Sequence, residues 1–287
     1  MKKTGLILEG GGMKNAYQAG VLDAFLDCGI TFDYVIGVSA GAANGASFLA
    51  GQRGRNRRFY TDHVTEPDYF GMKSFLKKGD LFNLSYIYGD LSNEDGADYL
   101  DFDALMSNPA EYEVTATNAL TGEPAYFSKD QMIRNSYIHI MASSAIPVVC
   151  RPVFIDGVPH YDGGISDAIP VKRALDQGCE KVVCVLSKSR NYVKKPEKFR
   201  PLYKIFCHKY PQAVKDMDTR HIMYRKCQNR MFSLEKAGRA FIFSLETDLV
   251  PGTYKMDPGV NQKLYELGLE DFENKKEALY SFMEKGV

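Results

Sequence analysis

Two glycine-containing turns near the start of the chain constrain its fold more than any other feature. The first, Gly10-Gly11-Gly12-Met13-Lys14, follows the apolar run Thr4–Leu8, and the second, Gly37-Val38-Ser39-Ala40-Gly41, also follows an apolar run. Short apolar runs bounded by glycine predict buried strands. Alanine has the highest helix propensity, so the alanine-rich residues 40–50 predict a helix. The sequence therefore predicts two strand-to-turn transitions within one α/β domain.

Ser39 is the candidate nucleophile. It stands at the predicted strand-to-helix turn, where Gly37 and Gly41 supply the missing side chains that a sharp G-x-S-x-G elbow requires. At the start of a helix its hydroxyl also lies near the positive end of the helix dipole. The pentapeptide is only moderately specific by itself, so its meaning depends on finding a base.

Histidine is not the predicted base. An α/β-hydrolase builds several strands before its elbow and supplies a late histidine, whereas one predicted strand precedes Ser39 here. None of the histidines follows a clear strand end with an acidic partner in a recognisable place: His63, His139, His160, His208 and His221.

Asp162 is the candidate base. It follows residues 153–161, which predict a short hairpin with its turn at Asp156-Gly157, and it precedes Gly163 and Gly164. An aspartate before glycines is also an ordinary turn former. Combined with the glycine loop and the elbow, however, its carboxylate can act directly on a serine hydroxyl, provided that burial raises its pKa and its orientation is fixed.

At this point the chain resembles the patatin-like phospholipase family. The resemblance rests on four segments in the family's order, which span about residues 5 to 170: the glycine-rich loop at 10–14, the nucleophile motif at 37–41, Ala142-Ser143-Ser144-Ala145-Ile146-Pro147, and Asp162-Gly163-Gly164. The resemblance implies a three-layer α/β/α sandwich with a central, mostly parallel sheet. Apolar runs at 112–117 and 181–186, alternating with helical stretches, independently favour an α/β sandwich.

The resemblance also implies a reaction and a set of site residues. The reaction is hydrolysis of a carboxylic ester through an acyl-serine on Ser39, with Asp162 as the other member of a dyad. The oxyanion hole is assigned to Gly10, Gly11, Gly12 and Met13, the elbow glycines are Gly37 and Gly41, and the supporting residues are Lys14, Gly163 and Gly164. The chain departs from the family pattern in having Lys14 for arginine and Asn15 for glycine. Lysine keeps the charge but loses the bidentate fork.

Length and composition bound the remaining possibilities. A chain of 287 residues permits one domain or two, and we predict a single domain over 1–287 because the motifs run from residue 10 to residue 164. No apolar run reaches the roughly 18 residues of a membrane span, and the chain enters its first strand without a secretory leader. The six cysteines lack paired C-x-x-C spacing, so we expect reduced thiols in a cytoplasm, no metal and no cofactor.

Residues 188–230 form a basic, aromatic region. They contain thirteen Lys or Arg against three Asp or Glu, interleaved with tyrosine and phenylalanine. This composition suits anionic lipid headgroups, but it would also suit nucleic acid or a solvated helical face. Because the catalytic signature points to acyl esters, we predict peripheral membrane contact and no nucleic-acid binding. A shorter basic segment, 53–58, is interpreted as the C-terminal end of the helix after Ser39, where cations are favoured.

Two further segments predict structure around the site. Residues 67–103 are typical of an insertion of loops and short helices, whose apolar side chains could pack as core or line an acyl pocket: Phe70, Met72, Phe75, Leu76, Leu81, Phe82 and Leu84. Residues 258–285 alternate apolar and charged positions at helical spacing and predict a docked C-terminal helix.

Three functions agree with these features. The first is a lipid acyl hydrolase. The second is an acyltransferase, in which an alcohol or thiol intercepts the same acyl-serine. The third is a binding module in which Gly10–Gly12 hold a phosphate at a helix N-terminus, a reading that leaves Ser39 and Asp162 unexplained. Substrate, physiological role and oligomeric state do not follow from the sequence.

Overall fold

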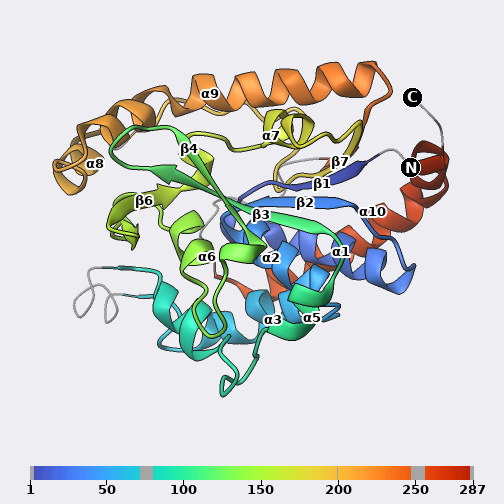
Figure 1. Ribbon diagram of the computed structural model, residues 1–287, viewed down its shortest axis with the longest axis horizontal. Helices are drawn as coiled ribbons and strands as arrows, with labels where there is room; N and C mark the ends of the chain where they lie inside the picture. The colour runs from blue at the N-terminus through green and yellow to red at the C-terminus, as the bar shows by residue number, and fades with distance from the viewer. Residues whose placement is uncertain (1–2, 72–79, 199, 247–255, 285–287) are drawn as a thin grey trace.

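A mixed, mostly parallel sheet forms the middle layer of the molecule (Figure 1). The computed structural model describes residues 3–71, 80–198, 200–246 and 256–284. Within them the eight-stranded sheet has the order β5-β6-β3-β2-β1-β7-β8, with β4 also paired to β3. The strands are β1 (Thr4–Leu8), β2 (Tyr34–Val38), β3 (Glu111–Asn118), β4 (Pro124–Ser128), β5 (Val153–Ile155), β6 (Val158–Asp162), β7 (Lys181–Val185) and β8 (Ala240–Phe243).

Helices cover both faces of the sheet. In Figure 1, α7 (Val171–Asp176) and α9 (Pro211–Lys236) lie above it, while α1 (Ala16–Asp27) and α2 (Ala40–Leu49) lie below it. The other α-helices of the described residues are α3 (Arg55–Thr61), α5 (Phe102–Ser107), α6 (Ile138–Ser143), α8 (Arg200–Phe206) and α10 (Pro258–Glu284). Short 3-10 or π-helical turns are η1 (Gly12–Asn15), η2 (His63–Thr65), η3 (Tyr86–Asp90), η4 (Lys129–Gln131) and η5 (Gly163–Ile165). This arrangement confirms the predicted α/β sandwich.

The two faces of the central strands bury two separate cores. Leu6 and Leu8 of β1 join the core under α1 and α2, whereas Ile7 between them joins the core that includes residues of α7 and α9. Successive side chains of a strand point to opposite faces. A parallel strand covered on both sides therefore reads as a continuous apolar run, which is why β1, β2 and β7 were predictable from sequence.

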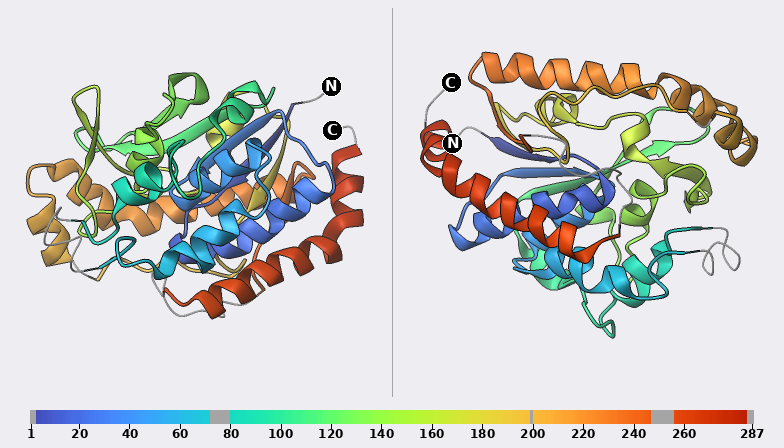
Figure 2. Two further views of the ribbon diagram at one scale, coloured as in Figure 1. Left: turned by 90° about the horizontal axis from the view of Figure 1, so that it is seen from below. Right: turned by 180° about the vertical axis from the view of Figure 1, so that it is seen from behind.

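The C-terminal helix α10 packs along α1 (Figure 2). The contact depends on two glycines, because a Cβ atom added at Gly20 would lie 2.0 Å from the Tyr265 carbonyl oxygen, and one added at Gly268 would lie 2.1 Å from that of Tyr17. The predicted helix over 258–285 is confirmed as far as Glu284, and residue 285 lies outside the described residues.

Strand register brings the two candidate catalytic residues together across β3. Val38 at the end of β2 is the register partner of Thr115, and the next residue of β3, Ala116, is the partner of Asp162 at the end of the antiparallel strand β6. Ser39 follows Val38 directly. Ser39 and Asp162, which are far apart in sequence, therefore lie close together at the carboxyl ends of β2 and β6.

The predicted insertion contributes both core and cavity wall. Phe70 packs on Phe82 with ring centroids 4.8 Å apart, and Phe82 and Leu84 are buried. Met72, Phe75 and Leu76 lie outside the described residues. The basic segment 53–58 is not the end of the helix after Ser39: α2 ends at Leu49, and a new helix, α3, starts at Arg55 after Gly54, whose φ is 77°.

Candidate active site

The predicted nucleophile elbow joins β2 to α2. Ser39 has φ 55° and ψ −128°, a region that residues with a Cβ atom rarely occupy. The chain can make this turn because Gly37 and Gly41, two residues away on either side, carry no side chain. A Cβ atom at Gly37 would lie 2.5 Å from the Ala42 Cα atom, and one at Gly41 would lie 2.4 Å from the Leu8 carbonyl oxygen.

A buried serine from α6 fixes the elbow backbone. The Ser39 N–H donates to Ser143 Oγ at 2.7 Å, and the Ser143 hydroxyl donates to the Thr115 carbonyl oxygen at 2.6 Å. Ser143 thus links the elbow to β3. Its segment was recognised in the sequence, but this role was not, because the contact joins residues 104 positions apart.

Asp162 lies beside the serine in a buried position. Its Oδ1 accepts a 2.7 Å hydrogen bond from the Gly164 N–H. Burial raises the pKa of Asp162 above its ordinary value, against the opposing effects of the Arg220 charge and of the nearby Ser39 hydroxyl. Gly163 is required by close packing, since a Cβ atom there would lie 2.2 Å from the Thr115 carbonyl oxygen.

The glycine-rich loop lies against the elbow. A Cβ atom at Gly10 would be 2.9 Å from the Val38 carbonyl oxygen and 3.0 Å from Ser39 Cβ, so only glycine permits this approach. Gly12 has φ 58°. Gly10, Gly11 and Gly12 line the same cavity as Ser39 and Asp162. Met13 and Lys14 follow in η1 and are buried.

Ser39 lies where two cavities meet. The first, of about 60 Å³, is mostly apolar, and the second, of about 200 Å³, is mostly polar. Both are lined by Gly12, Ser39 and Ile146. A ligand with an apolar part in the first cavity and a polar part in the second would therefore have the junction between its two parts beside Ser39.

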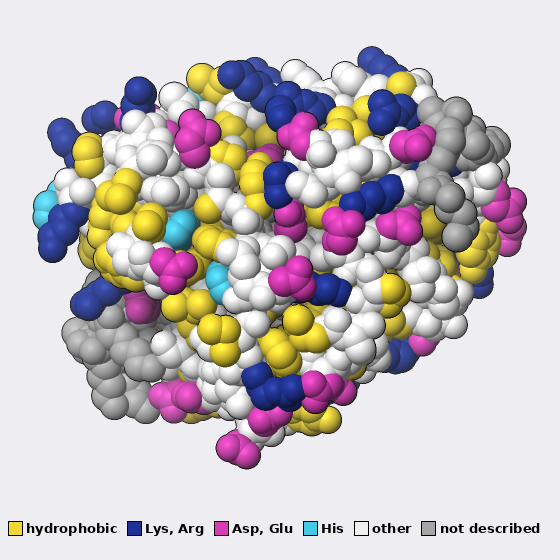
Figure 3. All heavy atoms as spheres, viewed as in Figure 1, with side chains coloured by type: hydrophobic (Ala, Val, Ile, Leu, Met, Phe, Trp, Pro, Cys, Tyr) yellow, Lys and Arg dark blue, Asp and Glu magenta, His cyan; other side chains and the backbone are white. Residues whose placement is uncertain are grey.

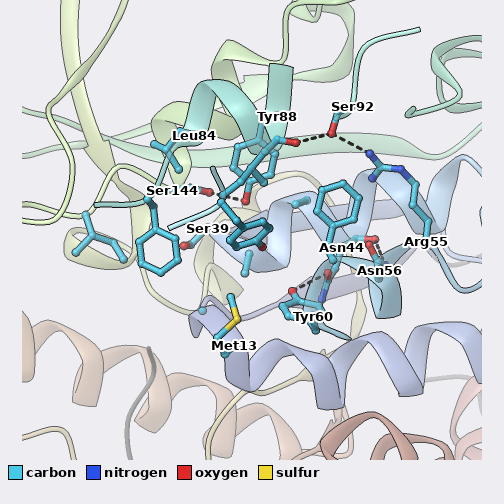
Figure 4. Close-up of a pocket in the computed structure, with 18 residues that line it drawn as sticks. Met13, Ser39, Asn44, Arg55, Asn56, Tyr60, Leu84, Tyr88, Ser92 and Ser144 are labelled. Atoms are coloured by element: carbon cyan, nitrogen blue, oxygen red, sulfur yellow. Dashed lines mark hydrogen bonds between the residues drawn. The ribbon is translucent and has the colours of Figure 1, made fainter. Parts of the chain in front are cut away.

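The apolar cavity is walled by the insertion and by α2 and α3 (Figure 4). Leu84 and Tyr88 come from the insertion, and the Ser144 hydroxyl donates to the Tyr88 oxygen at 3.2 Å. Arg55 lies farther along the cavity. Its guanidinium donates hydrogen bonds to Ser47 Oγ at 2.8 Å and to Ser92 Oγ at 2.9 Å. Burial lowers the pKa of Arg55 to about 10.

The polar cavity is lined by charged side chains, which the sequence did not single out. Lys188, Lys194 and Glu197 come from the segment after β7, Arg220 and Tyr224 come from α9, and Glu9 follows β1. Arg220 Nε donates to the Gly164 carbonyl oxygen at 2.8 Å, two residues from Asp162. These lysines and Arg220 belong to the basic region 188–230, but composition alone could not separate them from its surface residues.

Histidine lines neither cavity. His160, the nearest in sequence to Asp162, has its Nδ1 at 2.9 Å from the Val158 carbonyl oxygen, and burial lowers its pKa. Among the residues that the structure describes, no three His, Cys, Asp or Glu side chains form a group that could hold a metal ion.

Comparison with known proteins defines the class to which this fold and site belong. The sequence pattern of the patatin-like phospholipases matches residues 6–175. The chain therefore belongs to the patatin-like phospholipase family. A second pattern, a domain of unknown function, matches residues 210–284, which include α9 and α10.

Individual relatives match a little under two thirds of the chain. The uncharacterized protein YjjU of Escherichia coli is 33% identical over 182 residues, which is 63% of this chain and 50% of that protein. The lysophospholipase nte1 of Aspergillus terreus is 26% identical over 64% of this chain, and the patatin-like phospholipase domain-containing protein 7 of Mus musculus is 25% identical over 65%. These matches span only 12% and 14% of the two longer proteins.

Among solved structures, VipD from Legionella pneumophila aligns with 96% of this chain and 67% of its own, with a TM-score of 0.45 and 15% sequence identity.

Proposed function

We propose that this protein is a serine lipid acyl hydrolase that cleaves carboxylic esters through a Ser39–Asp162 dyad and an acyl-serine intermediate. The observation that carries the proposal is the position of Ser39 between an apolar cavity and a polar one. An acyl ester has the same polarity, with a hydrocarbon chain on one side of the carbonyl group and an alcohol on the other.

Asp162 has the properties that a direct base needs. Burial raises its pKa and therefore its affinity for a proton, and the Gly164 N–H fixes its orientation. The Arg220 charge acts in the opposite direction and favours the ionised form that accepts the proton. Neither cavity supplies a histidine that could take this part.

The reaction follows from these positions. Asp162 accepts the Ser39 proton as the serine oxygen attacks the carbonyl carbon, and N–H groups of Gly11, Gly12 and Met13 stabilise the oxyanion. When the carbonyl reforms, the C–O bond to the alcohol breaks and Asp162 returns the proton to the leaving oxygen. Water then attacks the acyl-serine with Asp162 as base, and the serine recovers its proton as the fatty acid leaves.

We further propose a single domain over 1–287, located in the cytoplasm and touching membranes through the basic region 188–230. The packing of α10 on α1 supports the domain assignment. In the described part of the chain, no helix combines the length and apolar character needed to cross a bilayer. Exposed apolar side chains on α8, among them Leu202, Ile205 and Phe206, support contact with a lipid surface.

The dyad is tested by turnover and by covalent labelling together. The wild type, Ser39→Ala and Asp162→Asn are assayed on p-nitrophenyl esters, with intact-mass detection of a fluorophosphonate adduct. Both variants are expected to lose roughly 10³-fold or more in kcat, as triad knockouts do, and Ser39→Ala to lose the label. Turnover by a folded Ser39→Ala protein would contradict the proposal, whereas product analysis with an added alcohol separates hydrolase from acyltransferase.

A further inference from the structure

We propose that a cavity between the β5–β6 hairpin and the end of α8, here called the hairpin cavity, is a second binding site. Its ligand is a long-chain carboxylate, and an occupant there acts on the catalytic residues. The hairpin contributes Phe154 and Tyr161 to its walls, and α8 contributes Phe206. Strand β6 and helix α8 lie at the same end of the molecule (Figure 1). Binding at this position does not depend on the proposed hydrolysis.

The size of the hairpin cavity is the first support. Its volume is about 600 Å³, against about 60 Å³ and 200 Å³ for the two cavities at Ser39. Sites for small molecules usually enclose about 300–1,000 Å³. Among the described residues, none that lines the hairpin cavity also lines either cavity at Ser39. An occupant would therefore be bound outside the catalytic site.

The second support is the character of the walls, which are mostly apolar. The side chains of Phe154 and Phe206 are 52% and 47% exposed. Exposed apolar groups that gather in one place mark binding sites, whereas scattered ones do not. A hydrocarbon chain that lay against both rings would remove them from water, which is favourable.

The third support is the charge at the rim. Arg151 and Lys209 line the cavity and are exposed, and His208 lies next to Lys209. No Asp or Glu of the described residues lines it, although the Asp80 carboxylate accepts a 2.5 Å hydrogen bond from the Arg151 N–H. Both cations form charge-assisted hydrogen bonds with a carboxylate. Apolar walls with two cations at the rim therefore match an aliphatic chain that ends in a carboxylate.

Residues 145–150 connect the hairpin cavity to the catalytic site. The Ala145 carbonyl oxygen accepts a 2.9 Å hydrogen bond from the Asp162 N–H. Ile146 lines both catalytic cavities, and two residues farther on Val148 lines the hairpin cavity. An occupant that displaced this segment would therefore displace a wall of the catalytic site and the backbone partner of Asp162.

The backbone of this segment is strained at the point where a ligand would touch it. Val148 has φ 77°, which is exceptional for a β-branched residue. Such conformations persist where the surroundings fix them, and they concentrate at functional sites. The next residue is held by the insertion, since the Val149 carbonyl oxygen accepts a 2.7 Å hydrogen bond from the Leu81 N–H. A ligand packed on Val148 would thus act on a segment that also contacts the insertion around the apolar cavity.

Binding is measured by equilibrium dialysis with radiolabelled decanoate below its critical micelle concentration. We expect Arg151→Gln with Lys209→Gln to weaken decanoate binding by roughly fivefold or more, because two exposed charge contacts are lost, and to leave decanol binding unchanged. Lys215→Gln with Arg225→Gln removes the same two kinds of charge from exposed positions on α9 and is the matched control. Phe154→Thr should weaken the binding of both ligands, because it removes an apolar wall.

A fluorophosphonate adduct on Ser39 separates the hairpin cavity from the catalytic site. Labelled protein should bind decanoate as unlabelled protein does. If labelling abolishes binding while the Arg151 and Lys209 double variant binds normally, decanoate occupies the apolar cavity at Ser39 and the second site is wrong. Phosphatidylserine vesicles are tested in parallel. Vesicle binding that requires Arg151 and Lys209, without any binding of monomeric decanoate, would make this face a membrane surface and would also overturn the site.

The action on the catalytic residues is measured with p-nitrophenyl acetate. Saturating decanoate should change the wild-type kcat/KM by roughly fivefold, the lower end of the usual coupling between two sites. The Arg151 and Lys209 double variant should show no change at the same decanoate concentration. Saturable binding to the wild type with unaltered kcat/KM would overturn the coupling. A wild type that binds decanoate but hydrolyses no ester would contradict the dyad and leave the hairpin cavity as a binding site.

Discussion

Ser39 and Asp162 are each held in a state that an isolated residue would avoid. Ser39 has a positive φ, and Asp162 is a carboxyl group placed where burial opposes its charge. Unfavourable backbone conformations of this kind cost of order 1–3 kcal/mol and persist because the surroundings determine them. Here the Ser39 backbone is fixed by Ser143, so contacts elsewhere in the fold offset the cost of holding Ser39 and Asp162 in these states.

The first prediction concerns stability and pH. Because the folded-state pKa of Asp162 is raised, its contribution to stability is present below the unfolded pKa and is lost as the pH rises through the folded pKa. At pH 7.5, which lies above the unfolded pKa, burial of this carboxyl group therefore opposes folding. We expect Asp162→Asn to unfold at a higher temperature than the wild type at pH 7.5, by roughly 2–4 °C for each kcal/mol relieved.

Thermal unfolding followed by circular dichroism at pH 7.5 and at pH 4.5 checks this prediction. The advantage of the variant should shrink at the lower pH, and Asp176→Asn, at an exposed site on α7, should show no such pattern. A lower unfolding temperature for Asp162→Asn at pH 7.5 would show that the hydrogen bond from the Gly164 N–H outweighs the burial of the charge.

At the residue scale, the sequence predicted the positions but only part of their surroundings. Ser39 and Asp162 could be identified from the sequence because glycines mark the turns in which they lie. Ser143, Lys194 and Glu197 could not, because a hydrogen bond or ion pair formed by tertiary contact leaves no local pattern. Arg55 was misread as the end of a helix, since no signal in its own segment showed that its guanidinium would be buried against Ser92.

At the scale of elements, the insertion before β3 controls the size of the apolar cavity. Leu84 and Tyr88 form part of its wall, and the cavity of about 60 Å³ is small. We expect the wild type to prefer short acyl chains. Leu84→Ala should lengthen the preferred chain by about two or three carbons, because truncation of a buried leucine leaves a cavity.

The chain-length profile is measured with p-nitrophenyl esters from acetate to palmitate. Leu202→Ala, which truncates an exposed leucine on α8, is the control and should leave the profile unchanged. An unaltered optimum in Leu84→Ala would mean that the acyl chain does not enter this cavity.

The close contact of α1 and α10 gives a second prediction at this scale. Gly268→Ala would place a methyl group 2.1 Å from the Tyr17 carbonyl oxygen, so the helices must separate. Overpacking of this kind costs about 1–3 kcal/mol. Urea unfolding should show the loss, whereas Gly259→Ala, where the added atom meets nothing closer than 3.5 Å, should have little effect. Equal stability of the two variants would argue against a tight interface.

The helices and strands themselves were largely predictable. The apolar runs of β1, β2 and β7 are continuous because both faces of these strands are covered, and the glycines of the turns mark where they end. The insertion was predictable only as irregular, because its short turns, including the π-helical η3, have no clear period.

At the scale of the whole molecule, the basic region 188–230 divides into two parts. Lys188, Lys194 and Arg220 face the polar cavity, while other cations are exposed. Figure 3 shows Lys and Arg side chains gathered over α9 and α8, with hydrophobic atoms beside them at the α8 end. The basic region, which composition alone could not subdivide, therefore contains residues that line the polar cavity and other residues that lie on the exposed surface.

The surface part predicts salt-dependent binding to anionic vesicles. Lys204 and Lys209 are exposed at the α8 end, and each cation near such a surface contributes about 1 kcal/mol. Lys204→Glu with Lys209→Glu should weaken binding to phosphatidylserine vesicles by roughly tenfold or more in a co-sedimentation assay. The control, Lys263→Glu with Lys276→Glu, makes the same change in charge on α10. If both pairs lose binding equally, the attraction is not specific to α8.

The register of β2, β3 and β6 has a consequence for how this architecture can diversify. Asp162 is placed by its alignment with Ala116, and Ser39 by the alignment of the preceding residue, Val38, with Thr115, so the length of chain between them is not itself constrained. Segments between the strands can be exchanged or extended without moving Ser39 and Asp162. If these two residues carry the proposed reaction, changes in the insertion would alter the choice of substrate while the reaction stays the same.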